Sequence, residues 1–83
     1  MKPQVLVVDD EKTIADGLRL TLESEGFAVR TAGSVREALA AFTQCDPHAA
    51  IVDLMLPDGD GLALTRELRR RDPGLQVIVI TAY

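Results

Sequence analysis

The strongest constraint on the fold comes from three short apolar runs that are rich in β-branched residues. They are Val5–Val8, Ala49–Val52 and Val77–Ile80. None of them alternates with polar residues, which is typical of strands buried on both faces of a parallel sheet. A fourth segment, Ala28–Ala32, does alternate, which favours an edge strand. The sequence therefore predicts a sheet with two covered faces.

Helical patterns fill the gaps between these strands. The first ends near Gly26, the second opens with the capping box Ser34–Glu37, and the third runs from about Gly61 to Arg71. The apolar positions are Ile14, Leu18 and Leu22 in the first pattern, Val35, Ala38, Leu39 and Phe42 in the second, and Leu64 and Leu68 in the third. Strands and helices thus alternate along the chain, which predicts an α/β fold with right-handed crossovers.

Acidic side chains follow two of these strands at the points where the strands end. Asp9 and Asp10 follow Val5–Val8, the first predicted strand. Asp53 follows Ala49–Val52, which is the third predicted strand in chain order. In open α/β sheets, ligands bind where the strand order reverses, and an order of 2-1-3-4 puts that reversal between these two strands. Two carboxylates about 4 Å apart repel by roughly 4 kcal/mol at an effective dielectric constant of 20. A hard cation such as Mg²⁺ removes this repulsion, so the pattern predicts a metal site.

Simpler explanations compete for the same residues. Asp10 or Glu11 can cap the following helix, because a helix dipole favours a carboxylate at that end. Asp58–Gly61 indicates a turn and resembles part of a calcium loop, but the later ligands of such a loop are missing. Thr81 closes the last strand at the same edge, where threonine is commonly structural; beside a metal, its hydroxyl could instead hold a phosphoryl oxygen.

Composition argues against several classes of function. The chain has 83 residues and a formal net charge of -4, and it carries no basic stripe, so we expect no direct nucleic-acid binding by this segment. No apolar run approaches the roughly 20 residues that span a bilayer, so we expect no membrane contact. The single cysteine, Cys45, permits no internal disulfide and fits a reducing compartment. The expectation is a cytoplasmic protein.

Together, these positions resemble the receiver domain of bacterial two-component response regulators. The resemblance covers residues 1–83 and implies a flavodoxin-like parallel sheet of order 2-1-3-4. The residues that carry it are Asp9 and Asp10 after the first strand, Asp53 after the third, Pro57 and Asp60–Gly61 in the loop beyond, and Thr81 and Ala82 after the fourth.

The resemblance also implies a role for each site residue. Asp53 would be the nucleophile that accepts a phosphoryl group from a sensor histidine kinase. Asp10, Asp53 and the backbone carbonyl of Met55 would ligate Mg²⁺, and Asp9 would act largely through a bound water. Thr81 would hydrogen-bond the phosphoryl group and shift on phosphorylation, switching a transcriptional output domain. Such a module is a phosphoacceptor rather than an enzyme, with at most Mg²⁺-dependent self-phosphorylation and autodephosphorylation.

Two further residues bear on the lifetime of the phosphorylated state. In this family, Met55 and Tyr83 lie at positions whose side chains flank the phosphoryl group. Their bulk predicts slow attack by water, and hence a long-lived phosphoaspartate.

The chain departs from the family pattern at its C-terminus. Receivers have about five strands and five helices, so we expect residues 1–83 to be a receiver domain that lacks the fifth strand, the last helices and the lysine that pairs with the phosphoryl group. One helix is about 10 Å wide, which is too narrow to cover four strands about 4.8 Å apart. An apolar face and the Val77–Ile80 edge would stay open, so we expect either a longer protein or self-association.

Two other functions remain open at this point. Asp9, Glu11 and Thr13 resemble the D-x-D-x-T signature of haloacid-dehalogenase-like phosphatases, with Asp9 as the nucleophile, but that family needs Asp at position 11 and gives Asp53 no role. The second alternative is a receiver-like interaction module that is not phosphorylated.

Overall fold

A computed structural model describes residues 2–81 of the chain. The elements match the predicted alternation of strands and helices, with one short hairpin added before the third helix. In chain order they are β1 (Gln4–Val8), α1 (Lys12–Ser24), β2 (Ala28–Ala32), α2 (Val35–Cys45), β3 (Ala49–Asp53), β4 (Met55–Leu56), β5 (Gly59–Asp60), α3 (Gly61–Arg71) and β6 (Gln76–Ile80).

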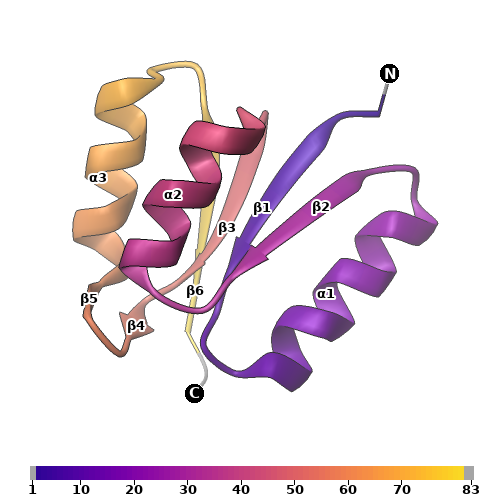
Figure 1. Cartoon of the computed structure of the whole chain (residues 1–83), viewed down its shortest axis with the longest axis horizontal. Coiled ribbons are helices and arrows are strands. Elements are labelled where there is room, and N and C mark those ends of the chain that lie inside the picture. The colour runs from indigo at the N-terminus through magenta and orange to yellow at the C-terminus, as the bar shows by residue number, and fades with distance from the viewer. Residues whose placement is uncertain (1, 82–83) are drawn as a thin grey trace.

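The main sheet has four parallel strands in the order β2-β1-β3-β6 (Figure 1). The predicted order 2-1-3-4 is therefore confirmed, with β6 as the fourth strand. Val7 of β1 is in register with Thr31 of β2 and with Ile51 of β3, and Ile51 is in register with Ile78 of β6. The order reverses between β1 and β3, so the carboxyl ends of these neighbouring strands lie side by side.

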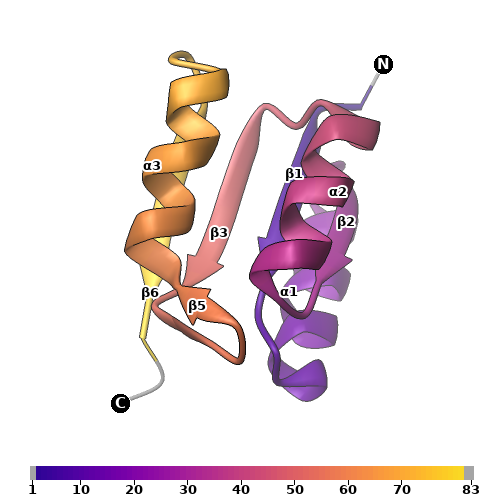
Figure 2. The ribbon, with the colours of Figure 1, turned by 60° about the vertical axis from the view of Figure 1, so that its left-hand side comes forward.

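The helices divide unequally between the two faces of the sheet. Helices α2 and α3 cover one face and α1 lies against the other, as the two ribbon views together show (Figures 1 and 2). The larger core cluster lies under α2 and α3 and includes Leu6, Phe42 and Leu68. The smaller cluster lies under α1, where Val5, Val7 and Ala15 are buried and Leu18 and Leu22 pack against them. Ala15, rather than the expected Ile14, is the buried residue in the first turn of α1.

The helix ends follow the local chemistry of the sequence. The Ser34 hydroxyl accepts a hydrogen bond from the Glu37 amide at 3.1 Å, and the Glu37 carboxylate accepts one from the Gly33 amide at 3.0 Å. This confirms the capping box, although Glu37 reaches the residue before the cap. Helix α1 ends just before Gly26, whose φ of 96° is a left-handed conformation that glycine adopts without strain.

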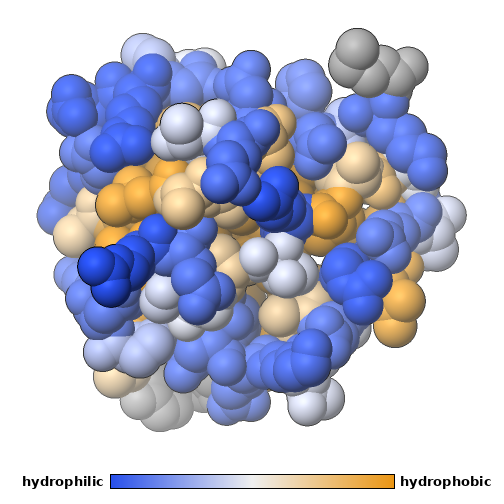
Figure 3. All heavy atoms as spheres, in the orientation of Figure 1, coloured by the Kyte–Doolittle hydropathy of each residue, from blue (hydrophilic) through white to orange (hydrophobic). Residues whose placement is uncertain are grey.

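The sheet is incompletely covered near β6 in the described part of the chain. Ile78 points to the same face as Val7 and Ile51, but its side chain is 61% exposed, and Val79 is 37% exposed. On the opposite face, apolar atoms show mainly in the gaps between the helices (Figure 3). The predicted open apolar face is therefore confirmed on the α1 side.

Candidate functional site

Three aspartates meet at the carboxyl edge of the sheet. Asp53 is the last residue of β3, and Asp9 directly follows β1, whose Val8 is in register with Val52. One carboxylate oxygen each from Asp9, Asp10 and Asp53 lies within 4.8 Å of the other two. The parallel pairing of β1 and β3 therefore brings together residues that are 44 positions apart in the sequence, as the strand order predicted.

Local backbone bonds fix two of the three carboxylates. Asp9 is 4% exposed, and its Oδ1 accepts a hydrogen bond from the Glu11 amide at 2.9 Å. Asp53 is 7% exposed, and its Oδ1 accepts one from the Met55 amide at 3.3 Å. Asp10 is exposed. Glu11 precedes α1 but makes no side-chain capping bond, so the capping explanation for Glu11 is wrong.

The site is electrostatically strained without a cation. Burial raises the pKa of Asp9 above its ordinary value, and the negative charges of Asp53 and Asp10 raise it further, although the Glu11 amide acts in the opposite direction. A group of hard oxygen donors that repel one another is the donor set that Mg²⁺ prefers, with several waters completing its coordination. The residues present therefore fit a magnesium ion.

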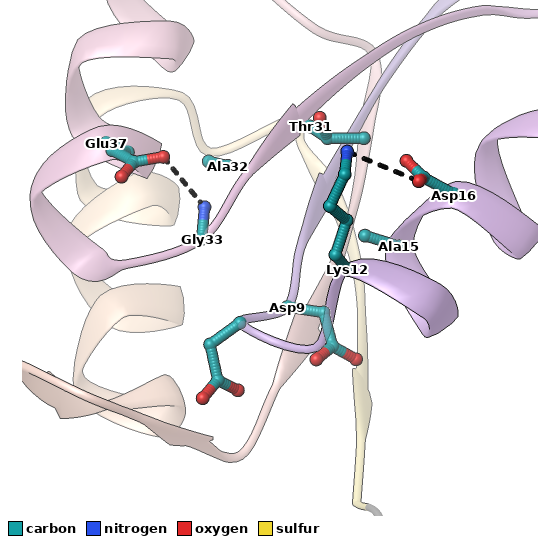
Figure 4. A pocket seen from close by; sticks show the side chains of 9 residues that line it. Asp9, Lys12, Ala15, Asp16, Thr31, Ala32, Gly33 and Glu37 are labelled. Atoms are coloured by element: carbon teal, nitrogen blue, oxygen red, sulfur yellow. Dashed lines mark hydrogen bonds and ion pairs between the residues drawn. The ribbon is translucent and has the colours of Figure 1, made fainter.

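A lysine lies near the acids but is paired elsewhere. Lys12 begins α1, and its Nζ lies 3.4 Å from Asp16 Oδ2 on the same helix, with the lysine side chain 87% exposed. The same residues line a pocket of about 150 Å³ beside Asp9, between the starts of α1 and α2 and the end of β2 (Figure 4). Lys12 thus extends over this pocket toward Asp16 and is paired with that carboxylate rather than with the three aspartates.

The remaining predicted residues lie near the same edge. Met55 follows Asp53 by two residues, and its side chain is 63% exposed. Thr81 is exposed and follows Ile80, the register partner of Asp53. Tyr83, which was expected to flank the phosphoryl group, lies outside the described residues.

The short hairpin β4–β5 was not predicted. Met55 pairs with Asp60 and Leu56 with Gly59, so the predicted turn at Asp58–Gly61 contains the second strand of a two-residue hairpin, and the first strand precedes it. The hairpin leads directly into α3, where the Asp60 carboxylate accepts a hydrogen bond from the Leu62 amide at 2.8 Å. The alternation of aspartate and glycine hid this pairing, because it is a stronger signal for a turn than for a strand.

Gly61 has a packing role that the sequence did not reveal. A Cβ atom at this position would lie 2.1 Å from the backbone oxygen of Asp53. The Gly61 amide donates to the Leu54 carbonyl at 2.8 Å, so α3 begins in direct contact with the end of β3. The only sequence signal was the Asp60–Gly61 pair, which carries no information about its contact with Asp53.

The fold and the acids define a doubly wound α/β domain with a ligand site at its topological switch point. Residues 5–83 match the family model described as "Response regulator receiver domain". The chain therefore belongs to the receiver-domain family of two-component response regulators. Receiver domains are signalling modules and not enzymes in the usual sense.

Known relatives agree with this assignment. The chain is 42% identical over 78 residues to the "Probable transcriptional regulatory protein TcrX" of Mycobacterium tuberculosis. The matched region is 94% of this chain but only 33% of TcrX, so the chain spans about a third of that relative's length.

Solved structures give the same answer. A CheY-like receiver domain protein from Methanospirillum hungatei superposes with a TM-score of 0.95 at 32% identity, covering 100% of this chain and 66% of that one. The response regulator TrrA from Thermotoga maritima, solved in complex with Mg²⁺ and BeF, superposes with a TM-score of 0.91 at 36% identity, covering 100% of this chain and 71% of that one.

Within residues 2–81, no helix has both the length and the apolar character needed to cross a membrane.

Proposed function

We propose that this chain accepts a phosphoryl group on Asp53 in a reaction that requires Mg²⁺. The observation that carries the proposal is the convergence of three carboxylates within 4.8 Å at the ends of neighbouring strands. An oxygen of Asp53 would form the new bond to phosphorus while the donor's bond to phosphorus breaks, so the phosphoryl group moves and the donor leaves. Mg²⁺, when bound, neutralises the approaching anions and aligns them.

The chain's own residues position these groups. Asp10, Asp53 and the Met55 backbone carbonyl would ligate the ion, and Asp9 would hold one of its waters. The Met55 amide fixes the rotation of the Asp53 carboxylate through its bond at 3.3 Å. Thr81, one residue past the register partner of Asp53, would donate its hydroxyl to the phosphoryl group. The solved TrrA complex with Mg²⁺ and BeF supports the choice of ion.

The family assignment and the composition of the site both argue against the phosphatase alternative. It needs Asp9 as the nucleophile and gives Asp53 no role, whereas Asp53 shares the site with Asp9 and Asp10 and the chain is a receiver domain. A receiver-like module that is not phosphorylated is the remaining alternative, and the experiment below separates the two.

The partners follow from the same proposal. The phosphoryl donor would be the phosphohistidine of a sensor kinase, and the phosphorylated module would switch a transcriptional output domain elsewhere in a longer protein, in the cytoplasm. TcrX is described as a transcriptional regulatory protein and is about three times as long as the matched region, which supports this choice of output. We further propose that residues 1–83 are an incomplete receiver domain and self-associate through the open face beside β6.

Phosphorylation by a small donor tests the central proposal. Purified chain is incubated with acetyl phosphate with and without Mg²⁺, and intact mass is measured for the wild type, Asp53→Asn and the distant control Asp72→Asn. We expect one added phosphate in the wild type and the control, only with Mg²⁺, and none in Asp53→Asn. Phosphate on Asp53→Asn contradicts the proposal. Mg²⁺ binding without any phosphorylation supports the interaction module instead.

A further inference from the structure

The loop after β3 is fastened to the first turn of α2 by one side chain. Asp58 lies at the tip of the β4–β5 hairpin. Its Oδ1 accepts a hydrogen bond from the Val35 amide at 2.7 Å, and its Oδ2 accepts one from the Arg36 amide at 3.0 Å. A carboxylate that accepts from two backbone amides at once is held in both position and rotation.

These two bonds complete the capping of α2. The first amides of a helix have no partner within the helix. The Ser34 hydroxyl, three residues before Glu37 in the sequence, accepts a hydrogen bond from the Glu37 amide at 3.1 Å. Asp58 accepts hydrogen bonds from the Val35 and Arg36 amides, although it lies 23 and 22 residues from them in the sequence. Ser34 and Asp58 therefore both cap the same helix, but only Asp58 ties it to another part of the chain.

Packing supports the same contact. A Cβ atom on Gly59 would lie 3.0 Å from Cγ2 of Val35, so the hairpin backbone lies directly against that side chain. Leu56 and Val35 both pack against the core cluster under α2 and α3. The two amide bonds lower the pKa of Asp58 below its ordinary value, because they favour the charged form of the carboxylate.

The other end of the hairpin reaches the acidic site. The Met55 amide donates to Asp53 Oδ1, and Met55 pairs with Asp60 across the hairpin. The Gly61 amide donates to the Leu54 carbonyl at 2.8 Å. The segment between Asp53 and Gly61 is therefore attached at its two ends to the site, and at its tip to α2.

We propose that Asp58 is a positioning residue for the metal site, because it holds the hairpin that carries Met55 against α2. This inference rests on the proposed function, since it assigns to Asp58 the placement of a backbone ligand for Mg²⁺. Asp58 itself does not touch the ion or the phosphoryl group. Loss of its carboxylate frees the tip of the hairpin, so the Met55 carbonyl and the Met55–Asp53 bond lose their fixed geometry.

Three variants separate positioning from simple stability. Asp58→Ala removes both hydrogen bonds to α2, and Asp58→Asn keeps one acceptor oxygen. Ser34→Ala is the matched control, because it removes a cap from the same helix without touching the hairpin. Three quantities are measured for each: the Mg²⁺ dissociation constant by titration calorimetry, the exchange of the amide hydrogens of residues 54–56 and 58–60 without metal, and the melting temperature.

We expect Asp58→Ala to speed exchange in the hairpin and to weaken Mg²⁺ binding by about tenfold, the lower end of the loss that follows removal of a group that orients a metal ligand. Asp58→Asn should fall between Asp58→Ala and the wild type. Ser34→Ala should lower the melting temperature while leaving the Mg²⁺ affinity unchanged. An unchanged affinity in Asp58→Ala overturns the inference, and so does an equal loss in Ser34→Ala.

The design also distinguishes failure of the proposed function. If the wild type binds no Mg²⁺, the proposed function fails, and hydrogen exchange alone then decides whether Asp58 holds the hairpin. Faster exchange in Asp58→Ala but not in Ser34→Ala supports the contact, and wild-type exchange in Asp58→Ala overturns it.

Discussion

Asp9 is the residue at which stability and function conflict most clearly. It is 4% exposed, it faces two other carboxylates, and burial together with their charge raises its pKa. The metal-free chain therefore tolerates a destabilising charge that a bound cation relieves.

Replacing Asp9 with asparagine should stabilise the metal-free chain and weaken Mg²⁺ binding. The amide oxygen of asparagine can still accept from the Glu11 amide, so only the charge is lost. We expect a gain of about 1 kcal/mol at pH 7, which is about 4–8 °C in melting temperature for a domain of this size.

The gain should depend on pH with a definite sign. The folded pKa of Asp9 is raised, so its ionisation destabilises the fold as pH increases through that pKa, and the cost is absent below the unfolded value of 3.8. Thermal melts of the wild type and Asp9→Asn should therefore converge near pH 3 and diverge toward pH 7. Asp72→Asn serves as the control. A destabilised Asp9→Asn at pH 7 would contradict this account.

The meeting of the three aspartates was predictable from the sequence, but their different surroundings were not. Strand ends and strand order were enough to place Asp9, Asp10 and Asp53 at one edge. The burial of Asp9 and the exposure of Asp10 depend on the turn after β1, which leaves no pattern in the sequence. Asp58 was missed because its partners lie 22 and 23 residues away and Ser34 already explained the start of α2.

At the scale of single elements, the junction between β3 and α3 is the tightest contact at the site. Gly61 is buried at the start of α3, directly beside the backbone of Asp53. Gly17 lies inside α1, where a Cβ atom would meet nothing within 4 Å. A side chain at position 61 would therefore collide with the backbone of β3, whereas a side chain at position 17 has free space.

Alanine substitutions at these two glycines should act in opposite directions. Gly61→Ala should destabilise the chain by about 1–3 kcal/mol, because the backbone of β3 or α3 must move to admit the methyl group, and it should weaken Mg²⁺ binding by displacing Asp53. Gly17→Ala should stabilise by up to about 1 kcal/mol, because it lowers the entropy of the unfolded chain. Urea unfolding and Mg²⁺ titration measure both effects. Equal stability of Gly61→Ala and the wild type would refute the close contact.

Most elements could be read from the sequence because their signals are local. The strand Ala28–Ala32 and the helix Gly61–Arg71 were predicted with the bounds that the structure gives. Hairpin β4–β5 was not, because two-residue strands are held by their surroundings rather than by their own periodicity. Ala15, rather than Ile14, is the buried residue at the start of α1, because the face of α1 that lies on the sheet passes through Ala15, Leu18 and Leu22.

At the scale of the whole molecule, the uneven distribution of helices is the main feature. One helix covers the face that carries Val7, Ile51 and Ile78, and β6 has no neighbouring strand on its outer side among the described residues. The exposed fraction of Ile78, 61%, shows that α1 does not reach this part of the sheet. This arrangement followed from strand order and right-handed crossovers, so the sequence was sufficient to predict it.

A charge on this face should weaken the proposed self-association. Ile78→Lys places an ammonium on an exposed site, so folding stability should change by less than about 0.5 kcal/mol. Leu20→Lys is a matched control, because Leu20 is also 61% exposed but lies on the outer side of α1. Light scattering after size exclusion should show a smaller assembly for Ile78→Lys only. Equal masses for both variants would place the contact elsewhere.

The common direction of the four strands has a practical consequence for handling the protein. Gln4 begins β1 at the end of the sheet away from the acids, whereas Ile80 finishes level with Asp53 (Figure 1). A group attached ahead of Gln4 therefore starts at the end of the sheet opposite the three aspartates. Tags, dyes and immobilisation linkers placed there leave the acidic edge open to solvent and to Mg²⁺ during calorimetric titrations.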